Sequence, residues 1–97
     1  MSVRREAALI TGASSGIGRE LAKVFAKNDH DVVLVARREA ALRELADELS
    51  ETYDIEATVM PKDLSKPEAP QELFNAVQDA GLDVNILVNN EIGRAHV

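Results

Sequence analysis

The sequence contains no cysteine, which excludes disulfide bonds and thiol catalysis and fits a reducing cytoplasm. It has no block of basic residues and carries a net charge of −6, which argues against a nucleic-acid partner. No apolar run approaches the roughly 18 residues of a membrane span, and no apolar segment follows the charged start as in a signal peptide. No spacing of His, Asp or Glu indicates a metal site. We therefore expect a cytoplasmic protein without membrane or nucleic-acid contacts.

The length and composition set the size of the fold. Ninety-seven residues suffice for one small domain. Apolar residues make up 45% of the chain and charged residues 29%, which is typical of a soluble globular protein. The acidic net charge does not exclude an anionic ligand, because backbone N–H groups and one or two arginines dominate at a local site.

Four short apolar segments alternate with three amphipathic ones. The expected strands are residues 7–11, 32–36, 55–60 and 84–88, and the expected helices are residues 16–27, 39–52 and a third segment before residue 81. Helices between apolar strands predict parallel strands joined by right-handed crossovers. The sequence therefore predicts an α/β fold: a Rossmann-like, doubly wound parallel sheet, truncated to β-α-β-α-β-α-β, with strand order 3-2-1-4.

Apolar spacing also predicts which side chains of the first helix face the sheet. Ile17, Leu21, Val24 and Phe25 recur at helical spacing. The pair Asn28-Asp29 tolerates a left-handed backbone, and one of the two is expected to end this helix. In the second helix, the residues on the buried face are expected to be Leu42, Leu45 and Leu49.

The third helix has recognisable start and stop signals. Ser65 is a candidate N-cap, with Pro67 and Glu68 in the first turn. Gly81 is expected to end the helix. The expected apolar side consists of Leu73, Phe74, Ala76 and Val77.

A glycine-rich segment, Thr11–Gly18, lies between the first expected strand and the first helix. Gly12 suits a tight turn with positive φ, Gly16 removes a side chain where the backbone would meet a phosphate, and Gly18 lets the helix pack close to the strand. The helix start adds unpaired N–H groups and a positive dipole end. The segment is not a Walker A loop, because Arg19-Glu20 stands where Lys-Ser/Thr would be needed. The alternative is a purely structural turn.

The expected strand order places a topological switch point between the first and fourth strands. In open α/β sheets, ligands bind at the carboxyl ends of the strands at such a point. The glycine-rich segment leaves the first strand there, and Asn89-Asn90 leaves the fourth. This edge of the sheet is the predicted ligand site.

Three motifs occur in order at the expected elements. They are Thr11-Gly12-Ala13-Ser14-Ser15-Gly16-Ile17-Gly18, then Asp63-Leu64 after the third strand, and Leu87-Val88-Asn89-Asn90 after the fourth. Together they resemble the short-chain dehydrogenase/reductase family, over about residues 6–90. The resemblance implies that the pyrophosphate and adenosine ribose of a nicotinamide dinucleotide lie against Gly12, Ser14, Ser15, Gly16 and Ile17.

The other two motifs imply contacts to the rest of the dinucleotide. By the resemblance, Asp63 hydrogen-bonds the adenine amino group, with Leu64 beside the ring, and Asn90 lies by the nicotinamide ribose. Each motif also has a plain structural interpretation. Asp63 could be only a turn or capping residue before Pro67, and Asn89-Asn90 only a turn that ends a strand.

The end of the second strand bears on the choice between NADP and NAD. Cofactors without a 2′-phosphate are often held by an acidic residue at this place, which accepts from the ribose hydroxyl. Here the sequence is Ala36-Arg37-Arg38, which favours a 2′-phosphate and hence NADP. Arg37 is the better candidate, with Ser14 as a further donor. The alternative is two solvated arginines, one of which pairs on the helix face with a residue such as Glu39.

The resemblance implies hydride transfer between NADP(H) and an unknown small carbonyl or alcohol, assisted by a Tyr with a Lys four residues later and a Ser upstream. The single tyrosine, Tyr53, is followed four residues later by Ala57, so no residue here is assigned to catalysis. The full-length protein is expected to carry the catalytic half beyond this chain and to form a homo-oligomer. The alternatives are a non-catalytic NADP-binding or sensing module, or a truncated product with no activity.

Residues 1–90 are expected to form a partial NAD(P)-binding domain, and residues 91–97 depart from the family pattern. That pattern continues from Asn89-Asn90 with Ala-Gly, whereas this chain continues with Glu-Ile-Gly-Arg-Ala-His-Val. One permitted coding of these seven residues matches a common sequencing-library adapter. We therefore expect a non-native tail that arose by adapter read-through, which the source DNA would test.

Overall fold

The computed structural model describes residues 6–14 and 16–88, in which strands and helices alternate. The elements in chain order are β1 (Ala7–Thr11), α1 (Gly16–Lys27), β2 (Asp31–Ala36), α2 (Glu39–Tyr53), β3 (Ala57–Pro61), α3 (Ala69–Asp79) and β4 (Val84–Val88). The expected four strands and three helices are all present. Within these described ranges, no helix is both long and apolar enough to cross a bilayer.

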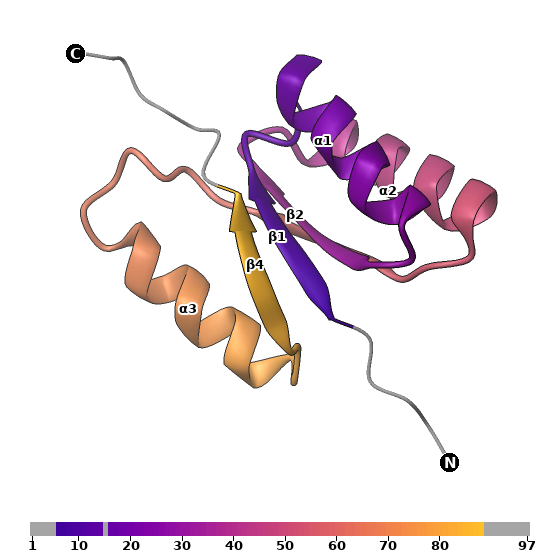
Figure 1. Cartoon of the computed structure of the whole chain (residues 1–97). Coiled ribbons are helices and arrows are strands. Elements are labelled where there is room, and N and C mark those ends of the chain that lie inside the picture. Colours follow the sequence, from indigo (N-terminus) through magenta and orange to yellow (C-terminus); the bar gives the residue numbers. More distant parts are fainter. Residues whose placement is uncertain (1–5, 15, 89–97) are drawn as a thin grey trace.

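The four strands form one parallel sheet in the order β3-β2-β1-β4 (Figure 1). In β1, Leu9 pairs with Val33 of β2 on one side and with Leu87 of β4 on the other. All five residues of β1 are buried, as expected for a central strand with helices on both faces. The predicted strand order is confirmed, and the boundary between β1 and β4 is the topological switch point.

Helices α1 and α2 cover one face of the sheet, and α3 covers the other (Figure 1). Successive strand residues point to opposite faces, so Ile10 and Leu34 pack toward α1 and α2, whereas Leu9 and Val33 belong to the core beneath α3. The first core also contains the three buried leucines predicted for α2, Leu42, Leu45 and Leu49. The fold is therefore a doubly wound α/β arrangement, as the sequence predicts.

Helix α1 contacts the sheet through small residues rather than through the predicted large ones. Its buried residues are Gly18, Ala22 and Ala26, whereas Ile17 and Val24 are 69% and 52% exposed. The expectation for these two side chains is wrong, because small residues at i, i+4 and i+8 let the helix axis approach the sheet closely. The larger side chains are then displaced to the flanks. The predicted role of Gly18 in close packing agrees with its burial.

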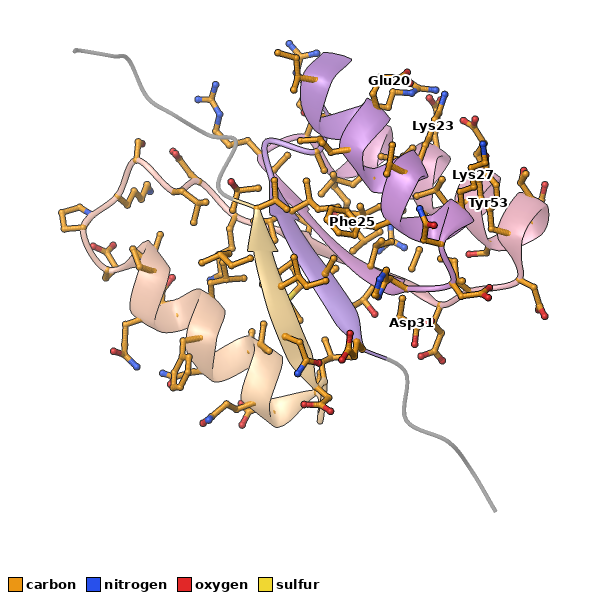
Figure 2. All side chains as sticks on the ribbon, in the orientation of Figure 1. Glu20, Lys23, Phe25, Lys27, Asp31 and Tyr53 are labelled. Atoms are coloured by element: carbon orange, nitrogen blue, oxygen red, sulfur yellow. The ribbon has the colours of Figure 1, made fainter. Side chains whose placement is uncertain are left out.

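Two further α1 residues are only partly buried. Leu21 is half-buried, and Phe25 packs against the core below the helix, as Figure 2 shows. The Phe25 ring also meets His30 edge-on, with the ring centroids 5.7 Å apart. Asp29 has a φ of 67°, which confirms the predicted left-handed end of this helix.

Charged side chains join α1 to α2 on the outside of the molecule. Lys23 Nζ lies 3.7 Å from both Glu20 Oε2 and Glu48 Oε2, and Figure 2 shows Lys23 and Glu20 together on the outer side of α1. Arg19 donates to Glu48 Oε1 over 3.2 Å. Exposed pairs of this kind contribute at most about 1 kcal/mol each. They orient the two helices rather than hold the fold together.

The helix α3 begins later than its sequence signals predict. Ser65 is not its N-cap, because the helix starts at Ala69 after Glu68, with Pro70 in its first turn. Ser65 instead donates its hydroxyl and its backbone N–H to Asp63 and so belongs to a turn that precedes the helix. Gly81 has a φ of 70° beyond the end of the helix, as predicted.

Only one of the four predicted apolar residues of α3 is fully buried. Leu73 packs against the sheet, and Ala76 and Val77 are half-buried. The expectation for Phe74 is wrong, because this ring is 56% exposed. Leu73 and Val77 are four residues apart and share the face toward the sheet, while Phe74 lies about 100° away around the helix.

Candidate functional site

The loop after β1 is held between its two neighbouring strands. Gly12 has a φ of 65°, which confirms the positive φ predicted for this turn. The N–H of Ala13 donates to the Val35 carbonyl of β2 over 3.2 Å, and Thr11 Oγ1 donates to the Val88 carbonyl of β4 over 3.4 Å. These two bonds anchor the loop at the topological switch point.

Open space lies in front of the first turn of α1. A Cβ atom built on Gly16 would meet no heavy atom within 4 Å. The first turn contains no acidic residue, so the positive end of the helix dipole is not neutralised from within the helix. Ser14 is half-buried beside this turn and Ile17 is exposed. Ser15 lies outside the described residues. The geometry therefore suits an anion at the start of α1.

Two exposed arginines follow β2. Arg38 occupies the N-cap position of α2, although its side chain makes no capping bond. Arg37 precedes the cap and therefore lies clear of the helix. Glu39, the alternative partner for one of these arginines, accepts instead from Arg43 Nη2 and Nε over 2.6 and 2.9 Å. The structure thus leaves the Arg37 guanidinium at the carboxyl edge of the sheet.

The segment after β3 is directed toward Arg37. The N–H of Lys62 donates to the Ala36 carbonyl over 2.9 Å, one step beyond the β2–β3 ladder. Asp63 follows, and its Oδ1 accepts from Ser65 Oγ over 2.6 Å and from the Ser65 N–H over 3.1 Å. These bonds, with smaller contributions from the charges of Arg37 and Lys66, hold the pKa of Asp63 below its ordinary value. Asp63 is therefore an ionised acceptor.

A groove of about 1030 Å³ begins at these residues and continues between α3 and the sheet. Thr11, Arg37, Asp63 and Leu64 line the end of the groove at the carboxyl edge of the sheet. Leu64 supplies an apolar wall there, since it also packs against the core beneath α3. Three of the predicted site residues, Arg37, Asp63 and Leu64, thus line one groove, whereas the described residues predicted from the loop after β1 do not line it.

A second pocket, of about 480 Å³, lies at the opposite, amino edge of the sheet. Four carboxylates line it, from Asp31, Asp54, Glu56 and Asp83. An anionic ligand is disfavoured there by charge. The carboxyl edge, with Arg37 and the start of α1, is the better candidate for a phosphate-bearing ligand.

Of two further residues named from the sequence, one lies outside the described residues and the other lies away from this site. Asn90 lies outside the described residues. Tyr53 is the last residue of α2, and α2 returns the chain from the carboxyl edge to the amino edge of the sheet, so Tyr53 lies at the far edge. Its side chain packs against the core on the side of the sheet that α1 and α2 cover.

One site residue was missed as such from the sequence. Its sequence context predicts a helix cap at Ser65, whereas Ser65 donates to the carboxylate of Asp63. The available signal was the Asp-x-Ser spacing, because an aspartate side chain commonly accepts from the backbone two residues later.

The model of the family described as short chain dehydrogenase matches residues 6–93. The chain belongs to this family. It is 39% identical over 71 residues to 7beta-hydroxysteroid dehydrogenase of Mediterraneibacter gnavus, an alignment that covers 73% of this chain and 27% of that protein. The chain thus spans about a quarter of the length of that curated relative.

Solved structures of similar proteins agree with the fold. L-sorbose reductase from Gluconobacter frateurii, complexed with NADPH and L-sorbose, superposes with a TM-score of 0.85 and 34% identity, over 100% of this chain and 37% of that one. A short-chain dehydrogenase from Sphingobium yanoikuyae in complex with NADPH superposes with a TM-score of 0.81 and 35% identity. The match covers 94% of this chain and 35% of that chain. This chain corresponds to about a third of each of these structures.

Proposed function

We propose that this chain is the cofactor-binding part of an oxidoreductase that transfers hydride between NADP(H) and a carbonyl or alcohol substrate. Family membership supports the reaction class, and two similar structures were solved with NADPH. The described residues fit such a cofactor. They combine a turn with positive φ at Gly12, open space at Gly16 and an arginine at the end of β2.

The diphosphate would bind at the start of α1. Unpaired N–H groups of the first helical turn and the positive dipole end stabilise negative charge there. Gly16 allows the backbone to approach the phosphate oxygens, since no side chain stands in the way. We assign Gly12, Ser14, Ser15, Gly16 and Ile17 to this part of the site, in line with the family resemblance.

The placement of Arg37 carries the proposal for NADP rather than NAD. Arg37 stands where an NAD-binding member of such a fold would present a carboxylate to the ribose. A guanidinium binds a 2′-phosphate through charge-assisted, bidentate hydrogen bonds. The bond of Glu39 to Arg43 supports this assignment, because Glu39 then does not occupy Arg37. We further assign Asp63 and Leu64 to the adenine ring and Asn90 to the nicotinamide ribose.

The described residues bind and orient the cofactor rather than transfer a proton. The nicotinamide, when bound, supplies or accepts the hydride. The only tyrosine lies at the opposite edge of the sheet, so we place the proton-transfer group outside residues 6–88. In the whole protein, residues 1–90 would be part of an NAD(P)-binding domain.

Binding calorimetry on the 97-residue chain tests the cofactor assignment. The probes are 2′,5′-ADP and 5′-AMP, which differ by the 2′-phosphate. We expect 2′,5′-ADP to bind at least tenfold more tightly, because charge-assisted bonds contribute about 1.5–3 kcal/mol. The substitution Arg37→Ala should remove this preference and leave 5′-AMP binding unchanged.

The matched control is Arg43→Ala, which deletes the same charge from the outer face of α2. It should keep the preference for 2′,5′-ADP. Equal affinity of the unaltered chain for the two probes would contradict the NADP assignment. If Arg38→Ala rather than Arg37→Ala removed the preference, the role would belong to Arg38.

A further inference from the structure

Both hydrogen bonds that the Asp63 side chain accepts from the described part of the chain end on the same carboxylate oxygen. Ser65 Oγ lies 2.6 Å from Oδ1 and the Ser65 backbone nitrogen 3.1 Å from it. The other oxygen, Oδ2, accepts no hydrogen bond from residues 6–14 or 16–88. Ser65 thus fixes the carboxylate plane and leaves one oxygen for a ligand.

The segment that carries Asp63 is also held at both ends. Lys62 is attached to β2 through the Ala36 carbonyl, and its Nζ lies 2.9 Å from Glu72 Oε1 of α3. The N–H of Lys66 closes a turn onto the Asp63 carbonyl over 3.3 Å. Asp63 and Leu64 therefore line the groove from a pinned segment rather than from a free loop.

We propose that Ser65 is a positioning residue that makes the adenine site selective for a base with an amino donor. The inference rests on the proposed function above. An ionised carboxylate only accepts hydrogen bonds, whereas a protonated carboxyl group also donates. By donating twice to Oδ1, Ser65 keeps Asp63 an acceptor and directs Oδ2 to the base. Adenine offers an amino group there, while hypoxanthine offers a carbonyl oxygen that repels the carboxylate.

The test is calorimetric titration of the chain with NADPH and with its hypoxanthine analogue, reduced nicotinamide hypoxanthine dinucleotide phosphate. We expect the unaltered chain to prefer NADPH by tenfold or more, because a hydrogen-bonding site left facing a mismatched group discriminates strongly. Ser65→Ala should lower that ratio about five- to tenfold. Ser65→Thr retains the hydroxyl and should retain the ratio.

Two further variants separate selectivity from a general loss of structure. Ser50→Ala removes a hydroxyl that bonds only to its own helix, at the Ala46 carbonyl, and should leave the ratio unchanged. Asp63→Asn replaces an acceptor-only group with one that also donates, and should bring the two affinities to within about twofold. A merely structural role of Ser65 would weaken both ligands equally and leave the ratio unaltered.

The outcomes distinguish this inference from the proposed function. If Ser65→Ala weakens both nucleotides equally, or the unaltered chain does not discriminate between them, the inference is overturned while NADP(H) binding stands. If neither nucleotide binds the unaltered chain, the proposed function fails and this inference fails with it.

Discussion

The backbone N–H of Lys62 donates to the Ala36 carbonyl over 2.9 Å, which extends the contact between β2 and β3 one residue beyond the sheet. This bond carries the following residue, Asp63, to the side of Arg37. Two residues that are 26 positions apart in the sequence therefore line the same end of one groove. The carboxyl ends of parallel strands meet at one edge, and the register between β2 and β3 decides which side chains face each other there.

Gly12 and Gly16 should respond differently to the same substitution. Gly12→Ala places a side chain at a φ of 65° and should lower the free energy of unfolding by about 1–2 kcal/mol. Gly16→Ala adds its methyl group in open space, so stability should change by less than about 1 kcal/mol. Nucleotide binding should nevertheless be lost, because the methyl group occupies the phosphate approach. Urea denaturation and calorimetry of both variants provide the measurements.

The result that contradicts this assignment is equally specific. A Gly16→Ala chain that binds 2′,5′-ADP as tightly as the unaltered chain would show that the phosphates do not approach α1 at this residue. An unchanged urea midpoint for Gly12→Ala would show that the turn accommodates an alanine without strain.

The small-residue contact of α1 predicts sensitivity to volume. Ala22 is fully buried between α1 and the sheet, so Ala22→Leu should destabilise the fold by about 1–3 kcal/mol through overpacking. Val24 is larger but exposed, and Val24→Ala should change the free energy of unfolding by no more than about 0.5 kcal/mol. Thermal or urea unfolding of the two variants measures both changes in the free energy of unfolding. The reverse order of effects would mean that α1 faces the sheet as the apolar periodicity alone predicts.

Asp63 should titrate below an ordinary aspartate. Its pKa is lowered first by the Ser65 hydroxyl, then by the Ser65 N–H, with a smaller contribution from Arg37. A lowered folded-state pKa means that the stabilisation is present above the unfolded-state pKa of about 3.9. It is lost as the pH falls through the lower, folded-state value. Carboxyl-detected NMR between pH 2 and 7 follows this titration.

The comparison variant for this titration is Ser65→Ala, which should move the Asp63 midpoint upward toward the ordinary value. Arg37→Ala should raise the midpoint by less, since its charge is the smaller cause. This order of causes would be disproved if Ser65→Ala left the Asp63 midpoint unchanged, or if Arg37→Ala raised it more than Ser65→Ala does.

Strong local signals made much of the fold predictable. The apolar strands, the amphipathic helices between them and the glycines at 12 and 81 predict the elements, their order and the positive φ values that the structure confirms. Side-chain direction was less predictable. Helical spacing identifies an apolar stripe on α1 but does not indicate that Ala22 and Ala26, rather than Val24, form the contact.

The predictions of where α3 starts and of what Ser65 does were wrong for a related reason. Ser65 is a competent N-cap by residue type, and the sequence also offers it to Asp63 through a turn two residues long. A cap would use the hydroxyl oxygen as an acceptor, whereas the bond to Asp63 uses the O–H as a donor. The bond to Asp63 prevails in the structure, and the helix begins at Ala69 instead.

The family, the alternation of strands and helices and the glycine-rich turn after β1 could be predicted from the sequence, because these depend on residues that are near neighbours in the chain. The strand order pairs residues that are far apart, such as Leu9 and Leu87, and was predictable through the topology rules of α/β sheets. Three relationships became visible only in three dimensions: Arg37, Asp63 and Leu64 line one groove, Arg43 rather than Arg37 binds Glu39, and Ser65 donates to the carboxylate of Asp63. Those relationships depend on the register between parallel strands and on competition among nearby donors, which three-dimensional packing resolves.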